Sequence, residues 1–190
     1  HNYNWFDPSG LCPAGTPCDN NGHGTHTMGT MVGDDGAGNQ IGVAPAAKWI
    51  AAKGCETSGC SSASLLASGQ WVLAPTDVNG NNPRPELRPD IVNNSWGGGG
   101  GDRWYAETVN AWRAAGIFPV FSNGNSGPSC NTAGSPGDNP GSYAVGSYDV
   151  NNNFSFFTSR RPPRATRAPT LFPSAPRCRS VNSSWGGGYA

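Results

Sequence analysis

Short apolar segments alternate along the chain with polar, glycine-rich stretches. Four segments have the short apolar character of strands: residues 48–53, 90–94, 117–121 and 143–146. Three others have near-helical spacing: residues 23–32, 61–73 and 103–115, with Ser61 as a cap of the second and Gly116 as the stop of the third. Pro119 is unfavourable inside a strand because it lacks a backbone N–H. Residues 1–22 and 76–89 show little periodicity, so we expect loops there.

Strands that alternate with helices predict an α/β fold, a parallel β-sheet with helices on both faces. In such sheets, functional sites form at the carboxyl ends of the strands. Two polar clusters follow predicted strands, Asn93-Asn94-Ser95 and Ser122-Asn123-Gly124-Asn125. We therefore expect both clusters at the functional edge of the sheet.

The length of 190 residues fits one domain, residues 1–190. Its 28 glycines and 17 prolines indicate a loop-rich chain. The formal net charge is zero, so charge favours neither nucleic acid nor a membrane surface as a partner. No apolar run reaches the ~18 residues of a membrane-spanning helix. The chain begins at His1 without a signal peptide, and we expect it to be a mature or excised piece.

The six cysteines contain no Cys-x-x-Cys pair, which argues against a zinc knuckle. Cys12 lies close to Cys18 in the chain, and Cys55 lies close to Cys60, so each pair could staple a surface loop. Disulfides of this kind suit an oxidising, extracellular setting. Reduced thiols in a cytosolic protein are the alternative.

His23 and His26 are the candidate catalytic or metal-binding residues of the first predicted helix. Two histidines could ligate zinc, but the helical metalloprotease motif spaces them four apart with a glutamate between. Here they are three apart, and Gly24 and Thr25 stand between them. We therefore expect no metal site.

Five blocks in one order resemble the subtilisin-like serine proteases. They are residues 19–30 (the histidine block), 43–45 (Val-Ala-Pro), 91–97 (the substrate-binding strand), 120–127 (the oxyanion block), and 135–137 with 143–146. The aromatic segment 3–7 resembles the bacillopeptidase F-like branch of that family. The resemblance extends from about residue 19 to 159, and it implies a subtilisin-like fold.

The resemblance implies a serine-type endopeptidase that forms an acyl-enzyme, with His23 as general base. Histidine suits this role because its pKa lies near neutrality. Asn125 would donate its side-chain amide to the developing oxyanion. An extended polypeptide substrate would pair with the backbone of the strand block. The implied substrate-binding residues are Asn94, Ser95, Trp96, Gly97, Gly98 and Gly124. A glycine run after a strand could instead cradle phosphate, but no P-loop pattern is present.

Two blocks of that family have no counterpart in the chain. No Asp-Thr-Gly or Asp-Ser-Gly triplet precedes the histidine; Asp7 lies too close to it, and Asp19 matches a substrate-cleft position. No Gly-Thr-Ser-Met-Ala block supplies a nucleophile, although residues 181–190 resemble the approach to one. We therefore expect a partial peptidase domain, incomplete at both ends and inactive alone.

Residues 161–180 depart from the family pattern. Six of the twelve basic residues and five prolines fall between Arg160 and Arg179. A basic arm for an acidic partner and a solvated loop are two interpretations. Our preferred hypothesis is a local frame shift or sequence error, in which case Cys178 is spurious and Cys130 loses its apparent partner.

Two other functions remain open, a non-catalytic binding module on a degenerate protease scaffold and a metal-dependent hydrolase using His23 and His26. The protease interpretation requires no cofactor. The resemblance allows structural calcium, although no ligand cluster stands out. It also predicts a secreted protein that is a monomer at full length.

Overall fold

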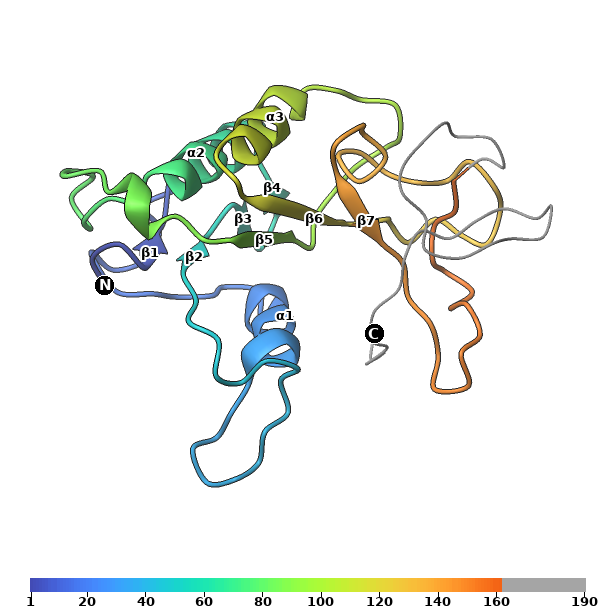
Figure 1. Cartoon of the computed structure of the whole chain (residues 1–190), viewed down its shortest axis with the longest axis horizontal. Helices are drawn as coiled ribbons and strands as arrows, with labels where there is room; N and C mark the ends of the chain where they lie inside the picture. Colours follow the sequence, from blue (N-terminus) through green and yellow to red (C-terminus); the bar gives the residue numbers. More distant parts are fainter. Residues whose placement is uncertain (162–190) are drawn as a thin grey trace. The chain divides into compact units, whose positions relative to one another are not determined.

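The computed structural model describes residues 1–161 and divides into two compact units, residues 1–90 and the part that begins at Ile91 (Figure 1). Each unit is described by itself. The predictions for the atypical segment, for Cys178 and for residues 181–190 lie outside the described residues, apart from Arg161.

A parallel pair of short strands organises the first unit. β1 (Trp5–Phe6) pairs with β2 (Ala51–Ala52), with Trp5 opposite Ala51. The amide of Lys53 donates to the carbonyl of Phe6 at 2.8 Å and extends the pairing. The prediction of a loop over residues 1–22 was therefore wrong at β1, and the strand expected over 48–53 is shorter than predicted.

α2 (Ser62–Leu73) forms the core of the first unit. The Ser61 side chain accepts a hydrogen bond from the Ser64 amide at 3.0 Å, which confirms the predicted cap. Trp71 is buried and stacks on Phe6 with ring centroids 5.5 Å apart. This contact joins the helix to β1.

α1 (His23–Val32) begins at the histidine, as predicted, and none of its residues is buried. Gly22 precedes it with a positive φ of 91°, a conformation that glycine adopts without strain. In Figure 1, α1 and α2 lie on opposite sides of the β1–β2 pair. A short 3-10 helix, η1 (Pro85–Leu87), interrupts the second predicted loop.

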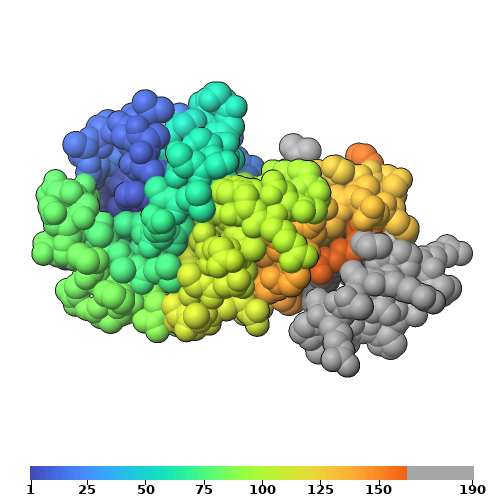
Figure 2. Space-filling view, turned by 90° about the horizontal axis from the view of Figure 1, so that it is seen from above, coloured from blue at the N-terminus to red at the C-terminus, as the bar shows by residue number. Residues whose placement is uncertain are grey.

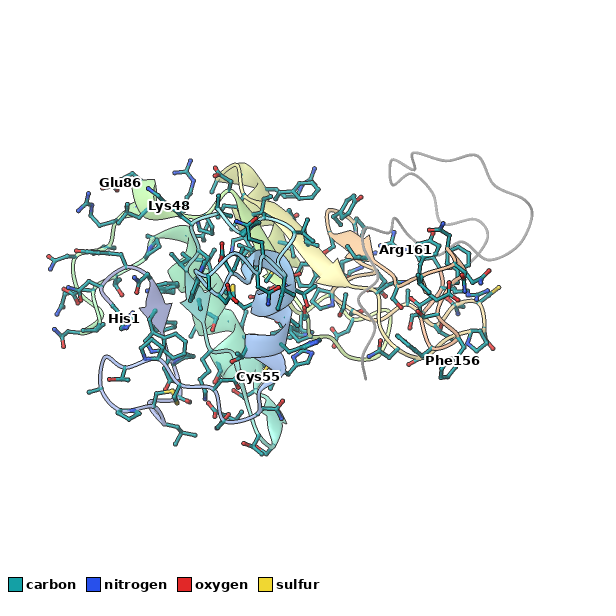
Figure 3. All side chains as sticks on the ribbon, turned by 90° about the horizontal axis from the view of Figure 1, so that it is seen from below. His1, Lys48, Cys55, Glu86, Phe156 and Arg161 are labelled. Atoms are coloured by element: carbon teal, nitrogen blue, oxygen red, sulfur yellow. A yellow bond between two sulfur atoms is a disulfide. The ribbon has the colours of Figure 1, made fainter. Side chains whose placement is uncertain are left out.

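Two disulfides confirm the cysteine pairs predicted as loop staples. Cys12 is bonded to Cys18, and Cys55 is bonded to Cys60. The second bond joins β3 (Cys55–Glu56) to β4 (Gly59–Cys60), an antiparallel hairpin that the sequence did not predict. Figure 3 labels Cys55.

A three-stranded parallel sheet forms the second unit, in the order β5 (Ile91–Asn94), β6 (Phe118–Ser122) and β7 (Tyr143–Val145). All three strands were predicted to within two residues. Pro119 is tolerated in the central strand because it lies opposite Val92 of β5, and pairing with β7 begins one residue later at Val120.

α3 (Ala106–Ala114) packs on β6. It begins later than the predicted Arg103 because the Asp102 carboxylate accepts from the Trp104 amide and forms a local turn. Gly116 follows the helix with a φ of 83°, as the predicted stop requires. The outer face of α3 is exposed on the side of the molecule that Figure 2 shows. Its buried residues, Val109 and Trp112, belong to the core of the second unit, together with Tyr105, Ile117, Phe121 and Ala144.

The parallel strands and intervening helices confirm the predicted α/β class. Within residues 1–161, the helices are too short or too polar to cross a membrane.

Candidate functional site

The loop before α1 is organised by the carboxylate of Asp19. One oxygen accepts from the amides of Asn21 and Gly22, at 3.0 and 2.8 Å. The other accepts from the amide and hydroxyl of Thr25, at 2.9 and 2.6 Å. The Thr25 hydroxyl and the Gly22 amide stabilise the charged form and hold the pKa of Asp19 far below its ordinary value, against a weaker effect of burial. Asp19 therefore acts as an N-terminal anchor of α1 rather than as a free acid.

His23 is the first residue of α1, and its side chain is exposed. Its backbone amide donates to the Asn21 side chain at 3.3 Å, while its imidazole has no hydrogen-bond partner among residues 1–161. An exposed imidazole without a partner can exchange a proton with a group brought to it. The Asp7 carboxylate does not bind His23, because it accepts hydrogen bonds from the Ser9 hydroxyl and the Cys12 amide.

A pocket of about 500 Å³ opens in the second unit beyond the carboxyl ends of β5 and β6. Among residues 1–161, the residues that line it carry no formal charge and are mostly small. The lining residues are Ser95, Trp96, Gly97, Gly98, Gly99, Gly100, Ser122, Gly124, Asn125, Ser126, Asn131, Thr132, Ala133 and Gly134. Bare glycine backbone on the wall leaves room for a ligand side chain.

Asn125 lines this pocket with an exposed side chain. Its side-chain amide has no hydrogen-bond partner within the described residues, so it is available to a ligand oxygen. The turn that carries it is fixed by Ser159, whose hydroxyl accepts from the Ser126 amide at 3.0 Å. A Cβ on Gly124 would lie only 2.8 Å from the Ser159 hydroxyl oxygen. The φ of Gly124 is 101°, in the left-handed region that favours glycine. Glycine is therefore required there.

A network of hydrogen bonds closes the wall formed by residues 97–102 against residues 133–138. The Gly98 amide donates to the Ser135 carbonyl at 2.8 Å. The Asp138 carboxylate bridges the two segments, since it accepts from the Gly101 amide at 2.6 Å and from the Ser135 hydroxyl at 2.7 Å. The Ser135 hydroxyl in turn accepts from the Asp102 amide at 2.9 Å. We call this arrangement the Asp138 bridge.

Most of the predicted site residues of the second unit come together at the pocket. Those that line it are Ser95, Trp96, Gly97, Gly98, Gly124 and Asn125. Asn94 does not line it: this residue is buried, and its amide donates to the Val120 carbonyl at 3.0 Å across β5 and β6. The lining segment 131–134 was not predicted, because a small polar loop carries no periodic signal. His23 belongs to the first unit.

Among residues 1–161, no group of three or more His, Cys, Asp or Glu residues could hold a metal ion.

A family model described as "Subtilase family" matches residues 12–175. The chain belongs to the subtilase family. The match includes α1 and every pocket-lining residue, so His23 and the pocket both lie within the subtilase region.

The chain is similar to curated proteins of two Bacillus species. It is 49% identical over 167 residues to Bacillopeptidase F of Bacillus subtilis (strain 168), an alignment that covers 84% of this chain and 11% of that protein. It is 36% identical over 144 residues to Subtilisin DY of Bacillus licheniformis, covering 74% of this chain and 48% of the relative.

The fold agrees with this membership. The solved structure of Sphericase superposes with a TM-score of 0.62 and 28% identity, covering 83% of this chain and 53% of that one. The chain thus spans about half the length of Subtilisin DY and Sphericase and a much smaller share of Bacillopeptidase F.

Proposed function

We propose that the chain carries part of the active site of a serine-type endopeptidase, with His23 as the general base. The observation that carries the proposal is that one subtilase region holds, in each unit, a group that has no hydrogen-bond partner among residues 1–161: the imidazole at the start of α1, and the Asn125 amide on the glycine-walled pocket. His23 would take the proton of a serine as it attacks a peptide carbonyl. The acyl-enzyme would then be released by water.

Asn125 is the proposed oxyanion donor. Its exposed amide lies on a turn held by Ser159, so the donor is in place before charge develops on the carbonyl oxygen. Such preorganised donors are effective because they need no reorientation during the reaction. Ser95, Trp96 and Gly97 would pair with the substrate backbone, and Gly98 and Gly124 would leave space for a side chain. Asn94 would support this strand from within the sheet.

The proposed substrates are polypeptides, and the proposed chemistry requires no cofactor. Two disulfides support an extracellular location, since such bonds persist in oxidising surroundings. We further propose that the full-length protein is a monomer.

A non-catalytic binding module on the same scaffold is the second candidate. It would be favoured if the complete gene product also lacked an Asp-Thr-Gly or Asp-Ser-Gly triplet and a Gly-Thr-Ser-Met-Ala block, which the 190 residues do not contain. Retention of Asn125 favours the peptidase, because a binding module has no need of an oxyanion donor.

Two measurements on the complete gene product separate the candidates. A serine-directed active-site probe should label the peptidase and leave a binding module unlabelled. His23→Ala should nearly abolish hydrolysis of a peptide ester. Unchanged hydrolysis would refute the role of His23.

Asn125→Ala tests the oxyanion role separately. We expect kcat to fall by about 10²–10³ with KM nearly unchanged; this range is the known effect of removing the corresponding kind of donor, a subtilisin asparagine. Asn151→Ala is the matched control, since it makes the same change at an exposed residue of the second unit that does not line the pocket and whose side chain makes no hydrogen bond in residues 1–161. An effect confined to KM would contradict the assignment.

A further inference from the structure

Asn20 connects the loop before α1 to the β3–β4 hairpin. Its side-chain amide donates to Glu56 Oε2 at 2.5 Å. Its backbone carbonyl accepts from the Thr57 hydroxyl at 2.7 Å. The hairpin therefore forms hydrogen bonds with both the side chain and the backbone of Asn20, which lies three positions before His23.

Glu56 is itself held in place. It forms an ion pair with Lys53, whose side chain is only 7% exposed. Hydrogen bonds from Lys53, then Ser9 and Asn20, stabilise the charged form and lower the pKa of Glu56 against the effect of burial. Because Lys53 follows β2, this pair ties the hairpin to the first unit's strand pair.

Disulfides fix both sides of this contact. Cys55–Cys60 closes the hairpin that carries Glu56 and Thr57. Cys12–Cys18 ends immediately before Asp19, whose carboxylate holds the first turn of α1. The loop of residues 19–22 is thus held at three points. The Cys12–Cys18 disulfide precedes it, the hairpin binds Asn20, and the Asp19 carboxylate accepts from the amide of Gly22 at its end.

We propose that the disulfide-closed hairpin of residues 55–60 is a positioning device for His23, in which Glu56 and Thr57 act through Asn20 as positioning residues. This inference rests on the proposed function of His23. In this proposal Thr57 and Asn20 act through the loop and not on the substrate. They limit the motion of the loop from which α1 starts, because loss of either bond frees residues whose backbone conformation sets the direction of the histidine.

Thr57→Val is the sharpest test, since it removes the hydroxyl and keeps the shape of the side chain. Thr16→Val is the matched control: Thr16 is also exposed, lies in the first unit, and has no side-chain hydrogen bond in residues 1–161. In the complete gene product, we expect Thr57→Val to lower kcat by about three- to tenfold, as loss of one hydrogen bond implies, with KM unchanged. Thr16→Val should leave both constants unchanged.

Glu56 supplies a second test with a conservative rescue. Glu56→Ala removes both the acceptor for Asn20 and the ion pair, and we expect a loss of about tenfold in kcat. Glu56→Gln keeps an acceptor oxygen for Asn20 and should recover most of this loss. Equal losses in the two variants would contradict the role of the Asn20 contact.

Amide hydrogen exchange on the same variants provides a readout independent of turnover. The amides of Gly22 and Thr25 should exchange about three- to tenfold faster in Thr57→Val, while amides of α2 stay unchanged. Unchanged exchange and unchanged kcat would overturn the proposal. So would a loss of kcat matched by an equal loss of folded protein. If His23→Ala kept full turnover while exchange changed as expected, the proposed function would fail and the hairpin's hold on the loop would stand.

Discussion

Replacement of Asp138 by asparagine tests how the pocket wall is held. The carboxylate accepts two hydrogen bonds, from the Gly101 amide and from the Ser135 hydroxyl. An asparagine side chain offers one acceptor oxygen, and its NH2 group faces a second donor. One bond of the Asp138 bridge must therefore break or rearrange. Hydrogen bonds to a charged group contribute about 1.5–3 kcal/mol, so we expect local opening of the wall to become easier by about this amount.

Amide exchange at Gly101 measures that opening directly. At about 1.4 kcal/mol per factor of ten, Asp138→Asn should speed exchange of the Gly101 amide by roughly 10- to 100-fold. The Asp102 amide, which donates to Ser135, should follow. Amides inside β6, such as that of Val120, should change little because they belong to the central strand.

Asp149→Asn is the matched control. Asp149 accepts hydrogen bonds from the backbone amides of Asn151 and Asn153 at 2.9 and 2.8 Å and a third from the Asn153 side chain at 3.2 Å, but it lies in an exposed loop that does not line the pocket. This variant should leave the Gly101 amide unaffected. If Gly101 exchanged at the wild-type rate in Asp138→Asn, the bridge would not hold the wall and the reasoning would be refuted.

Three further results are expected. Because the pKa of Asp19 is lowered, its stabilisation of α1 is complete above about pH 4 and is lost as the pH falls below that value. Amide exchange at Thr25 should become faster as this stabilisation is lost. Asp19→Asn should remove the pH dependence of that exchange. Trp112→Ala should destabilise the second unit by about 3–5 kcal/mol in urea unfolding, since Trp112 is buried against Phe121; a change below about 1 kcal/mol would contradict its core position. Thr158→Val leaves the Ser147 amide without its acceptor and should destabilise by about 1–3 kcal/mol, with exchange at Ser147 rising most.

The elements that the sequence predicted well are those with local signals. α2 has its serine cap and a continuous apolar stretch, and the three strands of the second unit are short apolar runs between turns. β1 was missed because two residues have no period of their own. Trp5 and Phe6 become a strand only through pairing with β2, about 45 positions along the chain. The β3–β4 hairpin was seen only as a cysteine pair, since its strands are equally short.

The candidate site was predictable to the extent that it follows a strand. Ser95 and Asn125 each come a few residues after a strand, and the structure brings both to the pocket. Segment 131–134 and Asp138 were not predictable, because only folding brings them against the glycine wall. Whether His23 and Asn125 act as base and oxyanion donor stays a prediction until the variants are measured.

The sequence spacing of the cysteines has a consequence for biosynthesis. Cys12 and Cys18 are six positions apart, and Cys55 and Cys60 are five apart. Closing so short a loop costs little conformational entropy of the chain, so each thiol meets its native partner far more often than a distant thiol. If the protein is secreted as proposed, both bonds can therefore form while the polypeptide is still emerging into the oxidising compartment. We expect them to mature correctly with little help from a disulfide isomerase.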